Sequence, residues 1–359
     1  MAKTLRWALP ALLGTAVAAL WEIPVAFGGR PDPERMRRSP QFHDGRFRNL
    51  APPLVQPARA RDLVGEMVFG KQQRKPTGPV PLVPPQAPAD EGLHITWYGH
   101  ASSLIEIDGR KVLVDPVWGR RVSPSRFVGP KRMHEPPHQL SELPELDVII
   151  VSHDHYDHLD RPTVVRLAKT QRAPFVVPLG VGAHLRRWRI PAERIIELDW
   201  DESVSVGGVE VTASAAQHFS GRAFTRNNTL WASWIVARSG RKVFYTADSG
   251  YFEGYRTIGE KYGPFDAALV QIGAYHPAWP DIHMTPEEGV AAHRDVRGGL
   301  LIPVHWGTFR LAMHGWSEPA ERAWSEAKAH DVALAIPRPG ERIDVDAPKP
   351  IDPWWQPIG

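Results

Sequence analysis

The segment His153-Asp154-His155-Tyr156-Asp157-His158 concentrates side chains that can carry chemistry. Three imidazoles and the Asp157 carboxylate stand within six residues, directly after an apolar run. Several charged imidazoles at one point would repel one another, whereas a divalent metal favours neutral nitrogen ligands. A bent loop can direct His153 and His155 at one ion, and Asp157 and His158 can reach a second. The segment therefore predicts a metal site.

Other ligands must come from elsewhere in the chain, because a protein-bound zinc ion takes three or more protein ligands. Three further residues each follow an apolar, strand-like run, and these are His218, Asp248 and His305. Each of them alone is also compatible with a core histidine or a turn aspartate. Their shared position after strands, in a chain that holds the histidine segment, favours a common metal centre.

Composition narrows the chemistry further. The 359 residues include no cysteine, which excludes disulfides, thiolate ligands and a cysteine nucleophile. The 42% of hydrophobic residues is enough for a sizeable core and excludes a wholly disordered chain. The formal net charge of +3 is far from the charge run of a nucleic-acid arm, so we expect no nucleic-acid partner.

The elements that must position these residues are mostly strands, beginning near His94. Hairpins are predicted at three turns, Asp108-Gly109, Gly207-Gly208 and Ser239-Gly240. Further buried strands are predicted at 147–152, 175–178, 267–272 and 300–304. Helices are predicted at 162–169, 285–295 and 317–330, and the second of these begins with the N-cap Thr285 followed by Pro286.

The chain is expected to comprise a leader, a proline-rich arm, a catalytic domain and a tail, at residues 1–28, 29–91, 92–346 and 347–359. Lys3 and Arg6 precede an apolar run at 7–21, as in a signal peptide or an uncleaved membrane anchor. An amphipathic helix packed on the domain is the alternative. A leader of this kind predicts a membrane-associated or periplasmic protein rather than a cytoplasmic one.

The histidine segment, followed in order by His218, Asp248 and His305, resembles the metallo-β-lactamase superfamily. The resemblance extends from about His94 to Val345. It implies an α/β fold, the αβ/βα sandwich of two mixed sheets flanked by helices. It also implies two zinc ions as cofactors, or other divalent metals in their place.

The resemblance also implies a role for each candidate ligand. The first ion would be bound by His153, His155 and His218. The second would be bound by Asp157, His158 and His305. Asp248 would bridge both ions, and Asp115 would orient the histidine loop from behind.

Additional segments are similar to one family within this superfamily, the N-acylphosphatidylethanolamine-hydrolysing phospholipases D. They include Trp97-Tyr98-Gly99-His100-Ala101, Gly129-Pro130-Lys131-Arg132, Ile272-Gly273-Ala274-Tyr275 and His305-Trp306-Gly307-Thr308-Phe309. Tyr156 and His283 match positions on that family's substrate side. The loop at 275–283 departs from the pattern, and His276 stands where an acid is expected. His100 is interpreted either as a support for the metal ligands or as a structural residue.

These expectations lead to a reaction. Two ions about 3.5–4 Å apart can share a hydroxide, and with two carboxylates the centre carries a formal charge of about +1. A phosphodiester, with its single negative charge, matches this centre. The predicted activity is hydrolysis of a glycerophospholipid headgroup by hydroxide attack on phosphorus, with Asp157, Asp248 and His283 as the catalytic residues. His283 would position the phosphate or deliver a proton.

Two other functions fit the same residues. One is a metallo-hydrolase of a soluble ester, lactone or cyclic phosphodiester, and the other is a metal-binding protein without turnover. The expected partners are a phospholipid or other phosphodiester substrate and a membrane surface. Two features are interpreted either as lipid contacts or as ordinary surface and packing, namely Trp354-Trp355 and the basic stretch with Arg120, Arg121, Arg126, Lys131 and Arg132.

Overall fold

Two β-sheets form the centre of the protein in the computed structural model, which describes residues 22–52, 65–66, 70–222 and 224–359. The seven-stranded sheet has the order β15 (Arg342–Asp344), β3 (Leu93–Gly99), β4 (Ser102–Ile107), β5 (Arg110–Val114), β6 (Val148–Ile150), β7 (Phe175–Pro178) and β8 (Ile195–Leu198). Its strands from β15 to β5 pair antiparallel, and those from β5 to β8 pair parallel.

The six-stranded sheet is mixed in the same way. Its order is β14 (Gly298–Val304), β13 (Phe265–Gln271), β12 (Arg241–Tyr245), β11 (Ser233–Arg238), β10 (Val209–Ser214) and β9 (Ser203–Val206). Strands β9 to β12 are antiparallel, whereas β12, β13 and β14 run parallel. All three predicted hairpins are therefore present.

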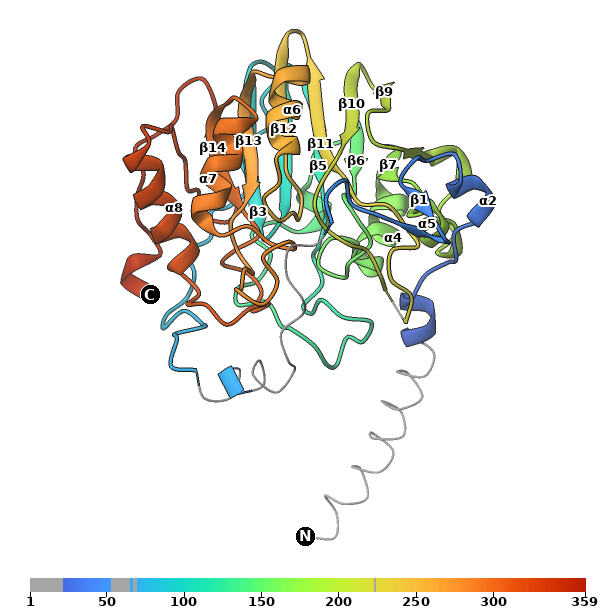
Figure 1. Ribbon diagram of the computed structural model, residues 1–359. Helices are drawn as coiled ribbons and strands as arrows, with labels where there is room; N and C mark the ends of the chain where they lie inside the picture. The colour runs from blue at the N-terminus through green and yellow to red at the C-terminus, as the bar shows by residue number, and fades with distance from the viewer. Residues whose placement is uncertain (1–21, 53–64, 67–69, 223) are drawn as a thin grey trace.

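Helices cover the outer faces of both sheets (Figure 1). The seven-stranded sheet is flanked by α4 (Arg161–Thr170) and α5 (Gly182–Arg187), and the six-stranded sheet by α6 (Gly254–Tyr262), α7 (Pro286–Asp295) and α8 (Glu318–Ala329). Thr285 caps α7 in a full capping box with Glu288. The arrangement confirms the predicted sandwich of two mixed sheets flanked by helices.

The central strands are apolar on both faces because both faces are covered. In β5, Val112 and Val114 belong to the core between the sheets, while Leu113 packs with the layer beneath α4. In β6, Val148 and Ile150 face the central core, and Ile149 faces the helices. This explains why the sequence there shows continuous apolar runs instead of alternation.

Strand direction brings the chemically interesting residues to one edge. The strands β5, β6, β10, β12 and β14 end at the same end of the sandwich, at the bottom of Figure 1. Asp115 follows β5, the histidine segment follows β6, and His218 follows β10. Asp248 and His305 follow β12 and β14.

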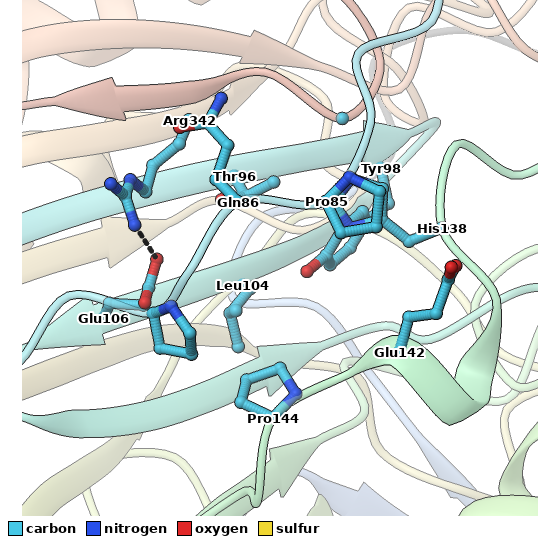
Figure 2. A pocket seen from close by; sticks show the side chains of 12 residues that line it. Pro85, Gln86, Thr96, Tyr98, Leu104, Glu106, His138, Glu142, Pro144 and Arg342 are labelled. Atoms are coloured by element: carbon cyan, nitrogen blue, oxygen red, sulfur yellow. Dashed lines mark ion pairs between the residues drawn. The ribbon is translucent and has the colours of Figure 1, made fainter.

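The described part of the arm packs on the domain. It contains the short helix α2 (Pro33–Met36) and the hairpin of β1 (Phe42–His43) and β2 (Arg46–Phe47). Further along, the Val83 amide donates to Pro339 O, and the Ala89 amide donates to the Glu106 carboxylate. Figure 2 shows Pro85 and Gln86 of the arm beside β3 and β4, where they close a hollow of about 20 Å³. That hollow is too small for a substrate.

The structure of the tail decides whether its two tryptophans contact lipid or pack within the protein. Trp354 and Trp355 are buried, and the Trp354 ring lies 5.5 Å from that of Trp306. The Trp355 indole N–H donates to Glu321 on α8. These two tryptophans therefore pack within the protein, and the reading of them as lipid contacts is wrong.

The predicted leader is described only from Glu22 to Gly28, and its apolar run at 7–21 lies outside the described residues. Within the described part, the Trp188 indole N–H donates to Val25 O and the Arg222 guanidinium donates to Ala26 O. In the ranges that the structure describes, no helix has the length and apolar character needed to cross a membrane.

Gly273, just after β13, offers a test of the edge where the ligands meet. A Cβ at this position would lie 2.1 Å from the carbonyl oxygen of His305. We expect Gly273→Ala to lower the free energy of unfolding by about 1–3 kcal/mol, because the two strand ends must separate. Chemical denaturation measures this. Gly315→Ala is the control, since its Cβ would meet its nearest atom at 3.5 Å; equal stability of the two variants would contradict the prediction.

Candidate metal centre

The histidine segment forms a turn that leaves β6 and directs its side chains inward. The amides of His158 and Leu159 donate to His155 O, which closes the turn. His153 and His158 are buried, and His155 and Asp157 are partly buried. The turn thus presents four potential ligands to the space between the two sheets.

One group of candidate ligands contains His153, His155, His218 and Asp248. Nδ1 of His155 lies 2.8 Å from Nε2 of His153 and 3.3 Å from Nε2 of His218. Oδ2 of Asp248 lies 3.9 Å and 3.8 Å from those same two Nε2 atoms. Three imidazole nitrogens and one carboxylate oxygen therefore converge on one point.

A second group contains His100, Asp157, His158 and His305. Oδ2 of Asp157 lies 3.3 Å from Nε2 of His305 and 3.6 Å from Nε2 of His158. Nε2 of His100 donates to the same oxygen over 2.9 Å. His100 therefore supports Asp157, which decides between the two interpretations of this histidine.

Asp248 connects the two groups. Its Oδ2 atom lies 3.0 Å from Nε2 of His158 and 3.1 Å from Nε2 of His305, in addition to its contacts with the first group. Its other oxygen, Oδ1, is buried and has no hydrogen-bond partner among the described residues. A single carboxylate thus faces both sets of imidazoles, as the predicted bridging position requires.

Asp115 holds the histidine loop from behind. Its carboxylate accepts from the Ser152 amide and hydroxyl, from Nδ1 of His158 and from the Tyr245 hydroxyl. The Ser152 hydroxyl, having donated to Asp115, can accept from Nδ1 of His153. Such contacts fix the tautomer and orientation of metal-binding histidines, so the Asp115 position matches its predicted role.

Outer contacts also show that the cluster suits a cation. Nδ1 of His153 donates to Ser152, and Nδ1 of His218 donates to Ile282 O. In the neutral rings, the Nε2 atoms of both histidines are then acceptors, and both face Nδ1 of His155, which can share at most one proton with them. Facing lone pairs repel, whereas a cation placed among them is bound by all of them.

The electrostatics of the second group also favour a bound cation. Burial opposes the charged form of His305, but Asp248 and Asp157 outweigh it and raise the pKa of His305 to about 9. Burial likewise opposes ionisation of Asp248, yet His158 and His305 hold the pKa of this carboxyl well below its usual range. The protein thus places positive charge beside two buried carboxylates, which is the position that a divalent cation suits. The donor set therefore fits divalent metal.

His283 lies between the cluster and a cavity. Its Nδ1 is 3.9 Å from Oδ2 of Asp248, and its ring is 5.0 Å from that of His305. It also lines a hollow of about 540 Å³ together with residues such as Tyr275, His314 and Arg322. Burial lowers the pKa of His283 to about 3, so the ring is neutral. This location agrees with the predicted substrate side.

Tyr156, inside the histidine segment, contacts Arg222. Its hydroxyl donates to Arg222 O, and its ring packs beside Val117 and Phe309. The Arg222 guanidinium lies over this ring and donates to the carbonyls of Asp154 and Leu159. Arg222 therefore fixes the same turn that carries the ligands.

Several supporting residues escape prediction from the sequence. Asp154, inside the histidine segment, is buried and accepts from the Gly221 amide, His184 and Thr229. Ser152 and Tyr245 complete the contacts of Asp115. Ser152 and Asp154 stand on either side of the first histidine in the sequence, but this position does not show which partners they contact. Asp154 and Tyr245 lie 30 to 130 positions from these partners.

Comparison with known proteins supports the same site. The family profile of the beta-lactamase superfamily domain matches residues 110–306. The chain belongs to the β-lactamase superfamily. The matched range includes the histidine segment, His218, Asp248 and His305, so the family match and the cluster coincide.

Individual relatives refine the position within this superfamily. The chain is 47% identical to an uncharacterized protein of Mycobacterium tuberculosis, over 98% of this chain and 95% of that one. It is 40% identical to N-acyl-phosphatidylethanolamine-hydrolyzing phospholipase D 1 of Caenorhabditis elegans, over 62% of this chain and 66% of the relative.

A solved structure supports the fold. Igni18, a metallo hydrolase from Ignicoccus hospitalis, is similar with a TM-score of 0.56 and 20% identity, over 70% of this chain and 97% of that chain. Fold, relatives and the buried histidine–aspartate cluster agree. The chain is a metal-dependent hydrolase of the β-lactamase fold.

Asp115 provides a test of the supporting contacts. We expect Asp115→Asn to weaken metal affinity by about 10–100-fold, because the histidine loop loses its charged acceptor. Titration of metal-free protein with zinc measures the affinity. The matched control is Asp147→Asn, at the opposite end of β5, where the carboxylate accepts from the Lys111 amide and Arg110. That variant should lose stability of about 1 kcal/mol but keep its metal affinity. If both variants lost affinity alike, the effect would be on folding.

Proposed function

We propose that this chain is a dinuclear-zinc phosphodiesterase that hydrolyses the headgroup bond of an N-acylated ethanolamine glycerophospholipid. The observation that carries the proposal is the position of Asp248 Oδ2. This atom lies within 3.9 Å of imidazole nitrogens from both candidate groups. One shared carboxylate between two ligand sets is the arrangement of a two-metal site.

The seven proposed ligands are assigned to two ions according to their positions in the two groups. One ion is assigned to His153, His155 and His218, and the other to Asp157, His158 and His305, with Asp248 shared. When bound, two divalent ions supply an activated water and stabilise the negative charge on the oxygens of the scissile phosphate. Everything else in the reaction depends on how the protein positions the substrate.

The lipid substrate is supported by the relatives and by charge. A curated relative with 40% identity hydrolyses N-acyl-phosphatidylethanolamine, as its name states. A centre of two divalent ions, two carboxylates and one hydroxide carries about one positive charge, which a phosphodiester neutralises. A lactone or an uncharged ester lacks this charge match. The phosphodiester is therefore favoured over the alternatives.

His283 is the proposed phosphate-positioning residue. It stands at the wall between the cluster and the hollow of about 540 Å³, so a group that reaches the cluster from this hollow passes its ring. A neutral imidazole here can donate a hydrogen bond to a phosphate oxygen, whereas protonation of the leaving alkoxide would need the charged ring, which burial opposes. Tyr156, held by Arg222, is the other proposed substrate-side residue.

The arm completes the hollow. Nε2 of His276 lies 2.8 Å from a carboxylate oxygen of Glu66, and both residues line the hollow. The resemblance leads us to expect an acid at position 276, and here an acid, Glu66, reaches His276 from the arm. We assign this His276–Glu66 pair to recognition of the leaving group, whose amide and hydroxyl offer hydrogen-bonding partners.

Asp248→Asn tests the shared carboxylate. Wild-type protein should contain about two metal ions per chain, and the variant one or none, with a loss of turnover of more than about 100-fold. Elemental analysis and a phosphodiesterase assay measure the two effects. Asp266→Asn is the control, because its carboxylate accepts the Lys242 amide at the opposite end of β12. An Asp248→Asn protein with normal metal content and rate would refute the bridging assignment.

Hydrolysis in oxygen-18 water tests the bond that breaks. Attack on phosphorus should place the label in the phosphate of phosphatidic acid, as mass spectrometry of the lipid product would show. The control is the same incubation after removal of metal by a chelator, which should yield no labelled product. Label in a released fatty acid would instead indicate acyl-ester cleavage. Turnover of soluble diesters alone would retain the metal chemistry and overturn the lipid substrate.

A further inference from the structure

A groove lined by cations lies beside the metal centre, on the far side of Phe309. It is a hollow of about 540 Å³, and its five basic residues are Arg74, Lys75, Arg121, Lys131 and Arg310. We call these five residues and their hollow the basic groove. Its floor is apolar and consists of Met133, Leu311, Ala312 and Met313.

Positive charge is concentrated in the basic groove. Among the described residues that line it, none is an aspartate or glutamate. Lys75, Lys131 and Arg310 are exposed, and Arg121 donates to the backbone carbonyl of Gly129. Like charges around one hollow repel one another, and an anion bound between them reduces that repulsion. The groove therefore suits a phosphate-bearing ligand above an apolar floor.

An apolar tip adjoins the groove in sequence and in space. Phe127 and Val128 are 40% and 65% exposed, and the next residues, Gly129 and Pro130, line the groove. The tip is held in place, because the Ser123 hydroxyl contacts the carbonyls of Ser125 and Val128. An exposed phenylalanine and valine flanked by arginine and lysine are typical of segments that enter the headgroup region of a bilayer.

The groove is also connected to the catalytic end. The Met133 amide donates to Thr308 O, three residues after His305. The Phe309 ring lies 5.1 Å from the His100 ring on one side and below the Arg132 guanidinium on the other. Leu311 of the groove packs in the same apolar cluster as Tyr156. This cluster therefore contacts both the basic groove, through Leu311, and the supports of the proposed metal centre, through Phe309.

The described end of the leader lies at the same loop. Arg126, directly before the apolar tip, forms an ion pair with Glu22 at 3.3 Å. Figure 1 shows the loop between β5 and β6 at the same end of the molecule as the described residues that begin at Glu22. Basic groove, apolar tip and leader therefore share one face.

We propose that this face docks on a bilayer of anionic phospholipids, with lipid phosphates in the basic groove and Phe127 and Val128 among the headgroups. The docking does not require the proposed function, but its consequence for catalysis rests on that function. An N-acylated ethanolamine lipid and phosphatidic acid both carry negative charge, so substrate and product would each retain the enzyme at the surface where it works.

Vesicle flotation of the full-length protein tests the docking. The probes are vesicles of phosphatidylcholine alone and of phosphatidylcholine with phosphatidylglycerol at roughly four to one. Wild-type protein should prefer the mixed vesicles, and added salt should reduce the preference. Each basic residue that is removed should lower partitioning about fivefold, so Lys131→Ala/Arg310→Ala should lower it by roughly 25-fold.

A matched variant controls for net charge. Arg256→Ala/Lys328→Ala removes the same charge from exposed positions on α6 and α8 and should leave the preference unchanged. An equal loss of the preference for anionic vesicles in both double variants, with equal unfolding midpoints, would refute the proposed role of the basic groove. Phe127→Ser/Val128→Ser should lower binding to both kinds of vesicle, and unchanged binding would overturn the insertion of the tip.

Inorganic phosphate distinguishes a lipid from a free anion. If phosphate abolished the vesicle preference at an ionic strength where chloride did not, the groove would be a site for free phosphate and the bilayer assignment would fail. Flotation needs no turnover. A wild-type protein that prefers anionic vesicles but hydrolyses no lipid would therefore refute the proposed function and support the docking surface.

Discussion

Two buried carboxylates facing a set of imidazole nitrogens are the constraint around which this protein is organised. Asp157 and Asp248 cannot stay ionised in such a place without positive charge nearby. The histidines around them present nitrogen lone pairs, since their opposite ring atoms are occupied by Ser152, Asp115 or a backbone carbonyl. A metal ion satisfies carboxylates and imidazoles together, and the surrounding sheets hold them ready for it.

The fold meets this constraint through strand direction. Both sheets are mixed, and the strands that run parallel deliver their carboxyl ends to one edge of the sandwich. Residues as far apart in the sequence as His158 and His305 become neighbours there, with ring centroids 5.2 Å apart. The opposite ends of the same strands carry carboxylates too, such as Asp147 and Asp266, but these accept from backbone amides and, for Asp147, from Arg110. A carboxylate at the carboxyl ends of the strands can bind metal, whereas the same residue type at their opposite ends has a structural role.

The sequence is informative where the determinants are local. The histidine segment is contiguous, and His218, Asp248 and His305 each follow an apolar run, so the ligands and the mixed sandwich can be predicted together. The N-cap of α7 is equally local and is found as expected. Buried strands also follow from apolar runs, although β6 is shorter than its run, because 151 and 152 already belong to the turn.

Contacts between distant segments are beyond such reasoning. His100 could have packed in the core, and only the pairing of β3 and β4 brings its Nε2 to Asp157. The contact of His276 with Glu66 joins residues 210 positions apart, across an arm without periodicity. The arm shows little periodicity, and only short local signals, Asp32-Pro33 and Asp44-Gly45, mark α2 and the β1–β2 hairpin. Their packing depends on surfaces that exist only after the sandwich has formed.

The buried tryptophans near the C-terminus have a consequence for synthesis. Trp354 packs against Trp306, which directly follows His305 and so backs one of the candidate ligands. Residues 354 and 355 leave the ribosome almost fifty positions after His305. The wall behind that histidine is therefore completed only after the chain has been translated well beyond His305. A nascent chain would carry most of its ligands before it could hold them rigidly, which delays a competent centre until the whole domain is available.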